Sequence, residues 1–324
     1  MDEFSVIKKY FAPLTMGRSG TEGLQDDGAV LSIPGGYELA VTSDSLNEGV
    51  HFMIGETPDV VARKALRVNL SDLASMGAKP LCYQLNIAFP NPPEETWLKA
   101  FSGALLDENK RYGIYCSGGD TTSIKSDYIS ISVTAFGYVP RGKAVRRSGA
   151  KKGDAIVITG PIGDAALGLK MLLAGEEGGD PAYKSAIKRS SLPEPRVGIE
   201  GILHKYANGA TDISDGLVAD CLHIARASGL GIEIDMKALK FSEAVQTAIR
   251  NGDFSLEEAV CGGDDYELVI AVSEGKTYRL LDELEKSNLK PLVIGKFADN
   301  GLKTDLIGNE EYLIDDLFKG WKHF

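Results

Sequence analysis

The sequence lacks long apolar runs and has few of the side chains that bind soft metals. No segment approaches the roughly 20 apolar residues that a membrane span needs, and the amino terminus, MDEFSVIKKYFAPL, does not resemble a signal peptide. The four cysteines are far apart without a CxxC pair, and the four histidines show no HxxxH spacing. The sequence therefore predicts reduced thiols, no thiolate metal site, and a cytoplasmic protein without membrane contact.

Positive charge is also scarce. Lys and Arg number 35 against 46 Asp and Glu, which gives a formal net charge of -11 at pH 7. Nucleic acids and anionic membranes bind surfaces rich in Lys and Arg, so neither is an expected partner. An anionic small molecule would be repelled as well, unless metal ions lay between it and the protein.

Common nucleotide-binding motifs are missing. There is no GxxxxGK[ST] loop, no complete GxGxxG after a predicted strand, and no HRD or DFG motif. These absences disfavour P-loop, Rossmann and protein-kinase folds. The run TGPIGDAALGL at 159–169 could hold an anion at a helix start, although a structural turn is the favoured interpretation.

Strand-like and helix-like segments alternate along the 324 residues. This pattern predicts an α/β or α+β chain, long enough for two domains. A basic stretch poor in apolar residues, 140–153, predicts a boundary near residue 145 and hence domains 1–145 and 146–324. The predicted strands cover 37–43, 81–89, 128–139, 154–159, 266–272 and 291–297.

Residues 58–76 form the clearest predicted helix, because Thr57 suits its N-cap and Gly77 its end. Asp72 falls on the apolar face of this helix. An unpaired buried carboxylate is costly, so Asp72 should be protonated, paired with a cation or bound to a metal, and a buried salt bridge stays open as the plainer alternative. The opposite face carries three basic residues, Arg63, Lys64 and Arg67.

Aspartates recur beside Gly, Ser or Thr, where strands are predicted to end or turns and helices to begin. They are Asp26, Asp27, Asp44, Asp72, Asp120, Asp212, Asp215, Asp264 and Asp265. Taken singly, most would be turn or N-cap residues. For Asp212 and Asp215, which precede a predicted helix at 217–228, an N-cap and a ligand are equally good interpretations. Thr42 and Asp44 alternate with Ser43, so two oxygen ligands project on one face of a strand.

The GGDT run gives a further predicted ligand. Gly119 would let a phosphate approach the backbone while Asp120 binds its metal. Carboxylate and hydroxyl oxygens favour hard ions such as magnesium, manganese or calcium, and a magnesium site is usually completed by phosphate oxygens. The sequence therefore predicts a nucleotide phosphate as substrate. A basic cluster could be a solvated linker or could contact phosphate; its members are Lys143, Arg146, Arg147, Lys151 and Lys152.

Eight short motifs occur in order along nearly the whole chain: QDDGAV, TSDSLNEGVHF, NLSDLASMGAKP, GGDTT, RRSGAKKGD, DISDGL, CGGDDYEL and GWKHF. Together they resemble the thiamine-monophosphate kinase family, which is similar to aminoimidazole ribonucleotide synthetases. The resemblance implies a two-domain α/β fold whose amino-terminal domain binds ATP and magnesium and forms a homodimer through its sheet. It also implies ATP-dependent phosphorylation of thiamine monophosphate to thiamine diphosphate by direct in-line transfer, in thiamine diphosphate biosynthesis.

The resemblance also implies residue roles. Several Mg²⁺ ions around the phosphates would be held by Asp27, Thr42, Ser43, Asp44, Asp72, Asp120, Asp212 and Asp215. The catalytic carboxylates among them would be Asp44, Asp72 and Asp120. ATP would contact Gly119, Asp120, Arg147 and Ser214, and thiamine phosphate would contact His51, Asp264 and Trp321. Two positions depart from the family pattern: Asp264 replaces a common Glu, and Gln25 replaces a glycine that often precedes the aspartate pair.

Two alternatives stay open. The chain could be another ATP-using member of the superfamily, such as an aminoimidazole ribonucleotide, formylglycinamidine or selenophosphate synthetase or a hydrogenase-maturation dehydratase. A selenophosphate synthetase needs a reactive Cys or selenocysteine near its amino-terminal glycine-rich segment, and no cysteine precedes Cys82. The second alternative is a non-catalytic binder of metal and nucleotide, which the complete aspartate set disfavours.

Overall fold

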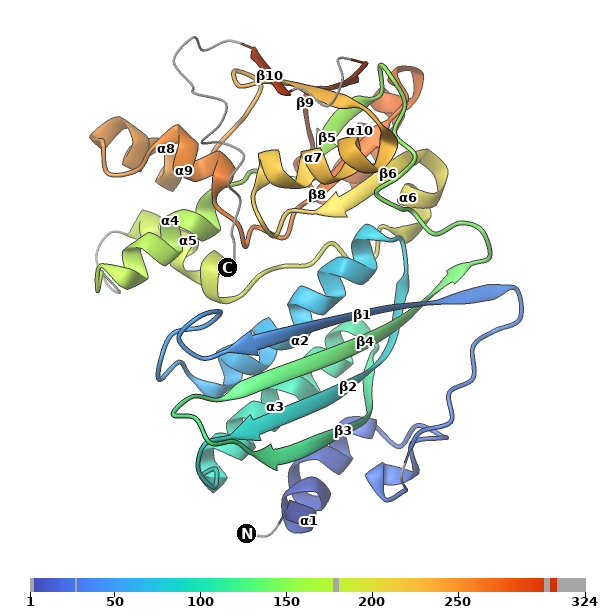
Figure 1. The fold of residues 1–324 in the computed structure, drawn as a ribbon, viewed down its shortest axis with the longest axis vertical. Helices are drawn as coiled ribbons and strands as arrows, with labels where there is room; N and C mark the ends of the chain where they lie inside the picture. The colour runs from blue at the N-terminus through green and yellow to red at the C-terminus, as the bar shows by residue number, and fades with distance from the viewer. Residues whose placement is uncertain (1–2, 27, 177–180, 300–303, 308–324) are drawn as a thin grey trace. The chain divides into compact units, whose positions relative to one another are not determined.

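The computed structural model describes residues 3–26, 28–176, 181–299 and 304–307. The chain divides into two compact units, and each is described by itself (Figure 1). Unit 1 comprises Met1–Leu73 and Ala78–Lys143, and unit 2 comprises Ala74–Gly77 and Ala144–Phe324. Within the described residues, no helix combines the length and apolar character that a membrane crossing requires.

Unit 1 is built on a four-stranded sheet with the order β1-β4-β2-β3. β4 pairs antiparallel with β1 and β2, whereas β3 runs parallel to β2. The strands are β1 Tyr37–Asn47, β2 Lys79–Phe89, β3 Tyr115–Ser123 and β4 Ser130–Pro140. The helices are α1 Glu3–Val6, η1 Ile7–Phe11, η2 Ala12–Thr15, η3 Glu22–Leu24, α2 Pro58–Ser75 and α3 Glu95–Tyr112.

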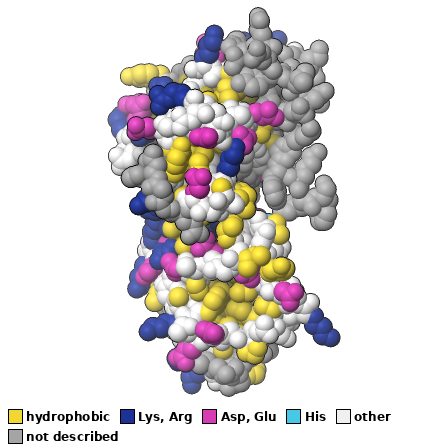
Figure 2. Space-filling model, turned by 90° about the vertical axis from the view of Figure 1, so that its left-hand side faces the viewer, with side chains coloured by type: hydrophobic (Ala, Val, Ile, Leu, Met, Phe, Trp, Pro, Cys, Tyr) yellow, Lys and Arg dark blue, Asp and Glu magenta, His cyan; other side chains and the backbone are white. Residues whose placement is uncertain are grey.

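The two faces of this sheet differ, because successive side chains of a strand point to opposite sides. α2 and α3 cover one side of the sheet (Figure 1). Ala40 and Leu46 of β1 are buried on that side, which they share with Thr42, whose hydroxyl contacts Asp72 of α2. Leu39 and Val41 point to the other side and are 43% and 51% exposed. Hydrophobic side chains are also visible on the part of unit 1 that Figure 2 presents. The sheet therefore has one packed face and one face with apolar groups at its surface.

The predicted helix at 58–76 is present as α2, and Gly77 follows it with a left-handed φ of 67°. Its basic side, however, is buried as well. Arg67 is buried and donates from Nε to Glu108 Oε2 at 2.7 Å, and Arg63 donates from Nη1 to Glu108 Oε1 at 2.8 Å. The basic face of the helix packs against α3, because Glu108 of α3 forms ion pairs with both arginines.

Unit 2 contains a six-stranded sheet with the order β10-β7-β9-β5-β8-β6. Its strands are β5 Ala155–Ile158, β6 Ala207–Asp212, β7 Gly231–Asp235, β8 Leu268–Val272, β9 Leu292–Ala298 and β10 Thr304–Ile307. Its helices are α4 Asp164–Leu173, α5 Pro181–Ser191, α6 Glu200–Tyr206, α7 Leu217–Ser228, α8 Glu243–Asn251, α9 Leu256–Cys261 and α10 Glu274–Lys286. β10 is parallel to β7, and the other neighbours are antiparallel.

Both faces of this second sheet are covered. Ile156 and Val269 belong to a buried cluster that includes side chains of α7, whereas Val157 and Ile270 belong to a second cluster with α6 and α10. Every residue of β8 is buried, which explains its continuous apolar sequence LVIAV. Unit 2 is thus a three-layer α/β structure.

All six predicted strands are present, whereas four further strands among the described residues were not predicted. One of these, β3, contains Asp120, which was expected in a glycine turn. The strand forms because Gly119 has no Cβ: with its φ of 152°, a Cβ would lie 1.9 Å from the carbonyl oxygen of Leu85 in β2. The glycine is therefore required by strand pairing, whatever ligand the segment binds.

Candidate functional site

Thr42, Asp44 and Asp72 form a cluster of oxygen atoms on the packed face of unit 1. The hydroxyl of Thr42 on β1 donates to Asp72 Oδ2 on α2. Burial, followed by the charge and hydrogen bond of Asp72, raises the pKa of Asp44 to about 7. Two carboxyl groups this close favour a shared proton or a cation between them. The donors are hard oxygens, which suit Mg²⁺ or Mn²⁺.

Ser43 does not join this cluster. Its side chain points to the opposite face of the sheet, where Oγ lies 3.0 Å from Oγ1 of Thr134. The same hydroxyl donates to the carbonyl of Val133 at 3.3 Å. The period of two along β1 thus separates Ser43 from the two predicted ligands that flank it.

Asp120 is also separate from the Asp44–Asp72 pair. The register runs from Asp44 in β1 through Val133 and Leu85 to Gly119 in β3, which places the backbone of Asp44 three strand spacings, or about 14 Å, from β3. Asp120 aligns with Asn86, whose exposed side chain alternates with buried neighbours in β2. Asp120 therefore lies on the face opposite the Asp44–Asp72 pair, and one chain does not gather the predicted catalytic set.

A cavity of about 210 Å³ adjoins Asp120. Gly119, Asp26 and Gly28 also contribute to its lining. The predicted ligand Asp27 lies outside the described residues. Unit 1 thus presents two separate groups of predicted site residues.

His51 lies just beyond β1, half-buried in the turn that follows. Its Nδ1 accepts a hydrogen bond from the backbone N–H of Asn47 at 3.0 Å. A neutral imidazole that accepts at Nδ1 carries its proton on Nε2, so the ring can donate to an anion from that side. The other residues predicted to contact thiamine phosphate are Asp264, in unit 2, and Trp321, which lies outside the described residues.

In unit 2, the predicted metal ligands Asp212 and Asp215 lie at the turn from β6 to α7. This turn is organised by Asp220, whose Oδ2 accepts from the N–H groups of Ser214 and Asp215, each at 3.1 Å. Burial, followed by the charges of Asp212 and Asp215, raises the pKa of Asp220 to about 8. Asp220 was not predicted, although its place in the first turn of a predicted helix was a usable signal.

Arg147 belongs to the same region. Its Nε donates to Oγ1 of Thr211 at 3.2 Å, next to Asp212 in β6. The structure therefore brings together the predicted ATP contacts Arg147 and Ser214 with the predicted metal ligands Asp212 and Asp215.

The segment 262–267 packs against the same turn. The backbone N–H of Asp264 donates to the carbonyl of Ser214 at 2.9 Å, and that of Tyr266 donates to Ile213 at 2.8 Å. Asp264 and Tyr266 have left-handed φ angles of 66° and 51°, and the Tyr266 hydroxyl donates to Asp264 Oδ1 at 3.2 Å. The predicted substrate contact Asp264 is thus held beside the predicted ATP contact Ser214.

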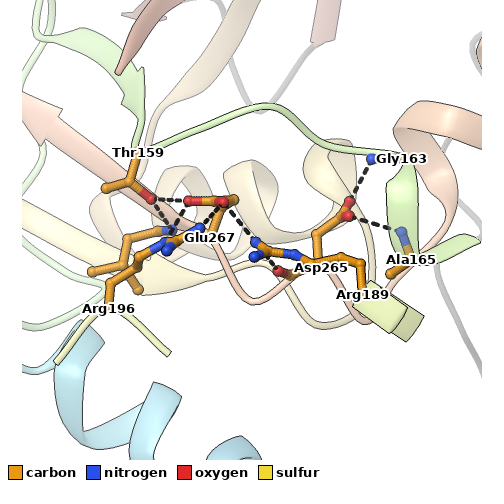
Figure 3. A network of polar contacts seen from close by, with 8 residues as sticks. Thr159, Gly163, Ala165, Arg189, Arg196, Asp265 and Glu267 are labelled. Carbon is orange, nitrogen blue, oxygen red and sulfur yellow. Dashed lines mark hydrogen bonds and ion pairs between the residues drawn. The ribbon is translucent and has the colours of Figure 1, made fainter. Parts of the chain in front are cut away.

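Glu267 anchors the end of this segment (Figure 3). It is 2% exposed and accepts hydrogen bonds from Thr159 Oγ1 at 2.6 Å, Arg189 Nη2 at 2.6 Å and Arg196 Nε at 2.8 Å. Arg189 also donates to the backbone carbonyl of Asp265 at 2.8 Å. No sequence pattern predicted these contacts, because they join positions more than 70 residues apart.

Asp265 occupies the helix start that the run 159–169 provides. Its carboxylate accepts from the N–H of Gly163 at 2.7 Å and of Ala165 at 3.3 Å (Figure 3). Burial raises the pKa of Asp265 to about 7, although these two donors act against the shift. The anion bound at this helix start is a side chain of the protein itself, which agrees with the structural-turn interpretation.

Comparison with known proteins places the chain in a class and then in a family. Residues 25–139 match the family model "AIR synthase related protein, N-terminal domain", and residues 151–305 match "AIR synthase related protein, C-terminal domain". The chain is therefore an AIR synthase related protein over most of its length. The thiamine-monophosphate kinase of Escherichia coli (strain K12) is 42% identical over 276 residues, 84% of this chain and 83% of that protein.

Solved structures agree with this match. The crystal structure of thiamine-monophosphate kinase from Stenotrophomonas maltophilia K279a covers 95% of this chain and 98% of its own, with 35% identity and a TM-score of 0.85. AaThiL complexed with AMPPCP and TMP covers 99% of this chain and 96% of its own, with 32% identity and a TM-score of 0.78. The chain belongs to the thiamine-monophosphate kinase family, which confirms the predicted family and its two-domain α/β fold.

Proposed function

We propose that this chain is an enzyme of thiamine biosynthesis that transfers the γ-phosphoryl group of ATP to thiamine monophosphate, giving thiamine diphosphate and ADP. Membership of the family over most of the chain carries the proposal. The complex of the related AaThiL with AMPPCP and TMP supports it, because both ligand types bind one protein of this fold.

The proposed chemistry is an in-line attack by a phosphate oxygen of the substrate on the γ-phosphorus. A phosphate monoester is mostly dianionic at pH 7, so it needs no dedicated base, and charge repulsion is the main obstacle. Thr42, Asp44 and Asp72 offer a cluster of hard oxygens that fits Mg²⁺. Bound there, Mg²⁺ would neutralise charge between the reacting phosphates. Further Mg²⁺ ligands in the proposal are Asp27, Ser43, Asp120, Asp212 and Asp215.

The other roles are proposed for residues in both units. Arg147 and Ser214 would contact ATP, which their place beside the turn after β6 supports. Gly119 and Asp120 would contact ATP from the cavity at the edge of β3. His51, Asp264 and Trp321 would contact thiamine monophosphate. Residues 1–145 would form the ATP- and Mg²⁺-binding and dimerisation domain and residues 146–324 the second domain, in a cytoplasmic enzyme.

A homodimer through the sheet of unit 1 is part of the proposal. Leu39 pairs in register with Tyr138, and Val41 with Phe136, so four apolar side chains share the face opposite the helices. Tyr37 adds its ring, whose centroid lies 5.3 Å from that of Tyr138. A second copy on this face would bury these groups.

A coupled assay of ADP release tests the activity. We expect turnover with thiamine monophosphate and Mg²⁺, and none with free thiamine or aminoimidazole ribonucleotide precursors as acceptor. Chelation of divalent ions should abolish turnover. Equal rates with free thiamine, or full rates in excess chelator, would overturn the proposal.

Sedimentation tests the dimer. Val41→Asp should shift the protein to monomers, because a charge would be buried at the proposed interface. Val30→Asp is the matched control, since Val30 is 78% exposed on a loop of the same unit. A Val41→Asp variant that sediments like the wild type would rule out this interface.

A further inference from the structure

Asp220 is a buried acid with one oxygen that the fold does not explain. It is 1% exposed, and its Oδ2 satisfies the N–H groups of Ser214 and Asp215. Its Oδ1 is also buried and has no hydrogen-bond partner among the described residues. The two hydrogen bonds within the turn explain the position of Oδ2 but not that of Oδ1. A buried carboxylate oxygen without a partner is costly, so a ligand at Oδ1 is expected.

His223 lies three residues after Asp220 on α7, and this spacing places both on one side of the helix. Asp215, Asp220 and His223 each offer a ligand atom, and these atoms lie within 4.8 Å of one another. Nε2 of His223 is 3.9 Å from Oδ2 of Asp215, which is too far for a hydrogen bond.

This separation fits two ligands of one metal ion. Ligand atoms that each lie about 2.1 Å from a divalent ion can be at most about 4.2 Å apart. The 3.9 Å pair already meets this limit. The longest separation in the group, up to 4.8 Å, would have to shorten by about 0.6 Å. The side chains of Asp215 and His223 are 44% and 36% exposed and can make this adjustment.

The charge of the region also favours a cation. Asp212 is buried at the end of β6, and its charge and that of Asp215 both act on Asp220. The guanidinium groups of Arg147 and Arg226 both act on His223, and Arg147 is also held by Thr211. The three carboxylates of Asp212, Asp215 and Asp220 therefore outnumber the two guanidinium groups.

We propose that Asp215, Asp220 and His223, all of unit 2, form a mixed carboxylate–imidazole site for a first-row transition-metal dication. Imidazole ligands favour such ions over Mg²⁺ and Ca²⁺, so this site selects a different metal from the cluster in unit 1. The inference shares only Asp215 with the proposed function.

Pulsed electron paramagnetic resonance of the metal-free full-length protein loaded with Mn²⁺ tests the site directly. An imidazole bound to Mn²⁺ gives ¹⁴N modulation of the electron spin echo, whereas an ion held only by oxygen does not. We expect this modulation in the wild type and its loss in His223→Gln. The control variants His51→Gln and His204→Gln should retain it. Absence of ¹⁴N modulation in the wild type, or its persistence in His223→Gln, would overturn the proposal.

A Mn²⁺ titration of Asp220→Asn provides a second test. Asn keeps an acceptor for the turn but removes the charge, so we expect affinity at the nitrogen-containing site to fall at least about tenfold. An unchanged affinity would remove Asp220 from the site. Turnover with Mg²⁺ is recorded in parallel: a wild type that phosphorylates thiamine monophosphate without a nitrogen signal would refute the site and leave the proposed function standing.

Discussion

Asp44 in unit 1 and Glu267 in unit 2 are carboxylates with opposite surroundings. The neighbour of Asp44 is a second acid, Asp72, which together with burial raises the pKa of Asp44 to about 7. Glu267 is more deeply buried but accepts hydrogen bonds from Arg189 and Arg196. A buried acid whose charge the fold compensates stabilises the fold, whereas an acid beside another acid is prepared for an added cation. Substitutions at four positions test this difference.

The largest expected effect is that of Asp44→Asn on turnover. Loss of a group that stabilises charge in the transition state lowers kcat by roughly 10³-fold. The melting temperature in metal-free buffer should not fall, because the substitution removes a like charge next to Asp72. A steady-state assay and a thermal melt measure both quantities. Asp59→Asn, at the start of α2, is the control and should keep turnover. Near-normal kcat in Asp44→Asn would contradict the role of Asp44.

Glu267→Gln should act on stability. The substitution leaves Arg189 and Arg196 without their acid, and breaking a buried ion pair costs about 3–5 kcal/mol. Urea unfolding measures this loss. Glu283→Gln is the matched control, because Glu283 pairs with Lys205 at the surface and should change stability far less than Glu267→Gln does. If both variants lost the same unfolding free energy, the buried ion pairs of Glu267 would contribute no more to stability than an ion pair at the surface.

Glu108→Gln extends the comparison to a compensated acid in unit 1. Burial raises the pKa of Glu108, but Arg67 and Arg63 outweigh burial and hold it below its ordinary value of 4.5. Glu108 therefore contributes stability that is present above about pH 4.5 and is lost as the pH falls through the lowered pKa. We expect the variant to lose about 3 kcal/mol at pH 7. The difference in stability between the variant and the wild type should shrink as the pH falls below about 4.5, where the Glu108 carboxylate becomes protonated.

Urea unfolding at several pH values checks this dependence. Asp107→Asn is the control, since Asp107 is its exposed neighbour and lies 3.6 Å from Arg63. A stability difference for Glu108→Gln that stays constant through the acid range would show that its charge contributes nothing.

The smallest effect concerns Asp264, which accepts a hydrogen bond from a neutral hydroxyl, that of Tyr266. Asp tolerates the left-handed φ of 66° better than Glu does, which gives a physical reason for Asp at this position. Asp264→Glu should lower stability by about 1 kcal/mol or less. Asp264→Asn should keep stability but raise KM for thiamine monophosphate more than KM for ATP. Equal changes in both KM values would contradict a substrate contact.

The sequence predicted the parts of the fold that depend on local pattern. Apolar periodicity located α2, and alternation placed Thr42 and Asp44 on one face of β1. β3 was not predicted, because its GGDTT sequence is typical of a turn and only the approach of Leu85 makes it a strand. Local pattern also carries no information on strand order, and this order is what separates Asp120 from Asp44.

Contacts distant in sequence were likewise out of reach. Glu267 was an ordinary residue of a predicted strand until the fold placed Arg189 and Arg196 against it. Ser43 shows a limit of a different kind: resemblance grouped it with the metal ligands, whereas alternation along β1 sends its side chain to the other face.

The close approach of Gly119 to β2 limits how the nucleotide preference of this protein can be altered. Any side chain at this position would collide with the Leu85 carbonyl and would shift β3 along or away from β2. Such a shift would displace Asp120, the next residue, so activity lost in a Gly119 variant would be mistaken for a lost ligand contact. Randomised libraries should therefore keep Gly119 constant and vary Thr121 and Thr122, whose side chains can change without forcing the two backbones apart.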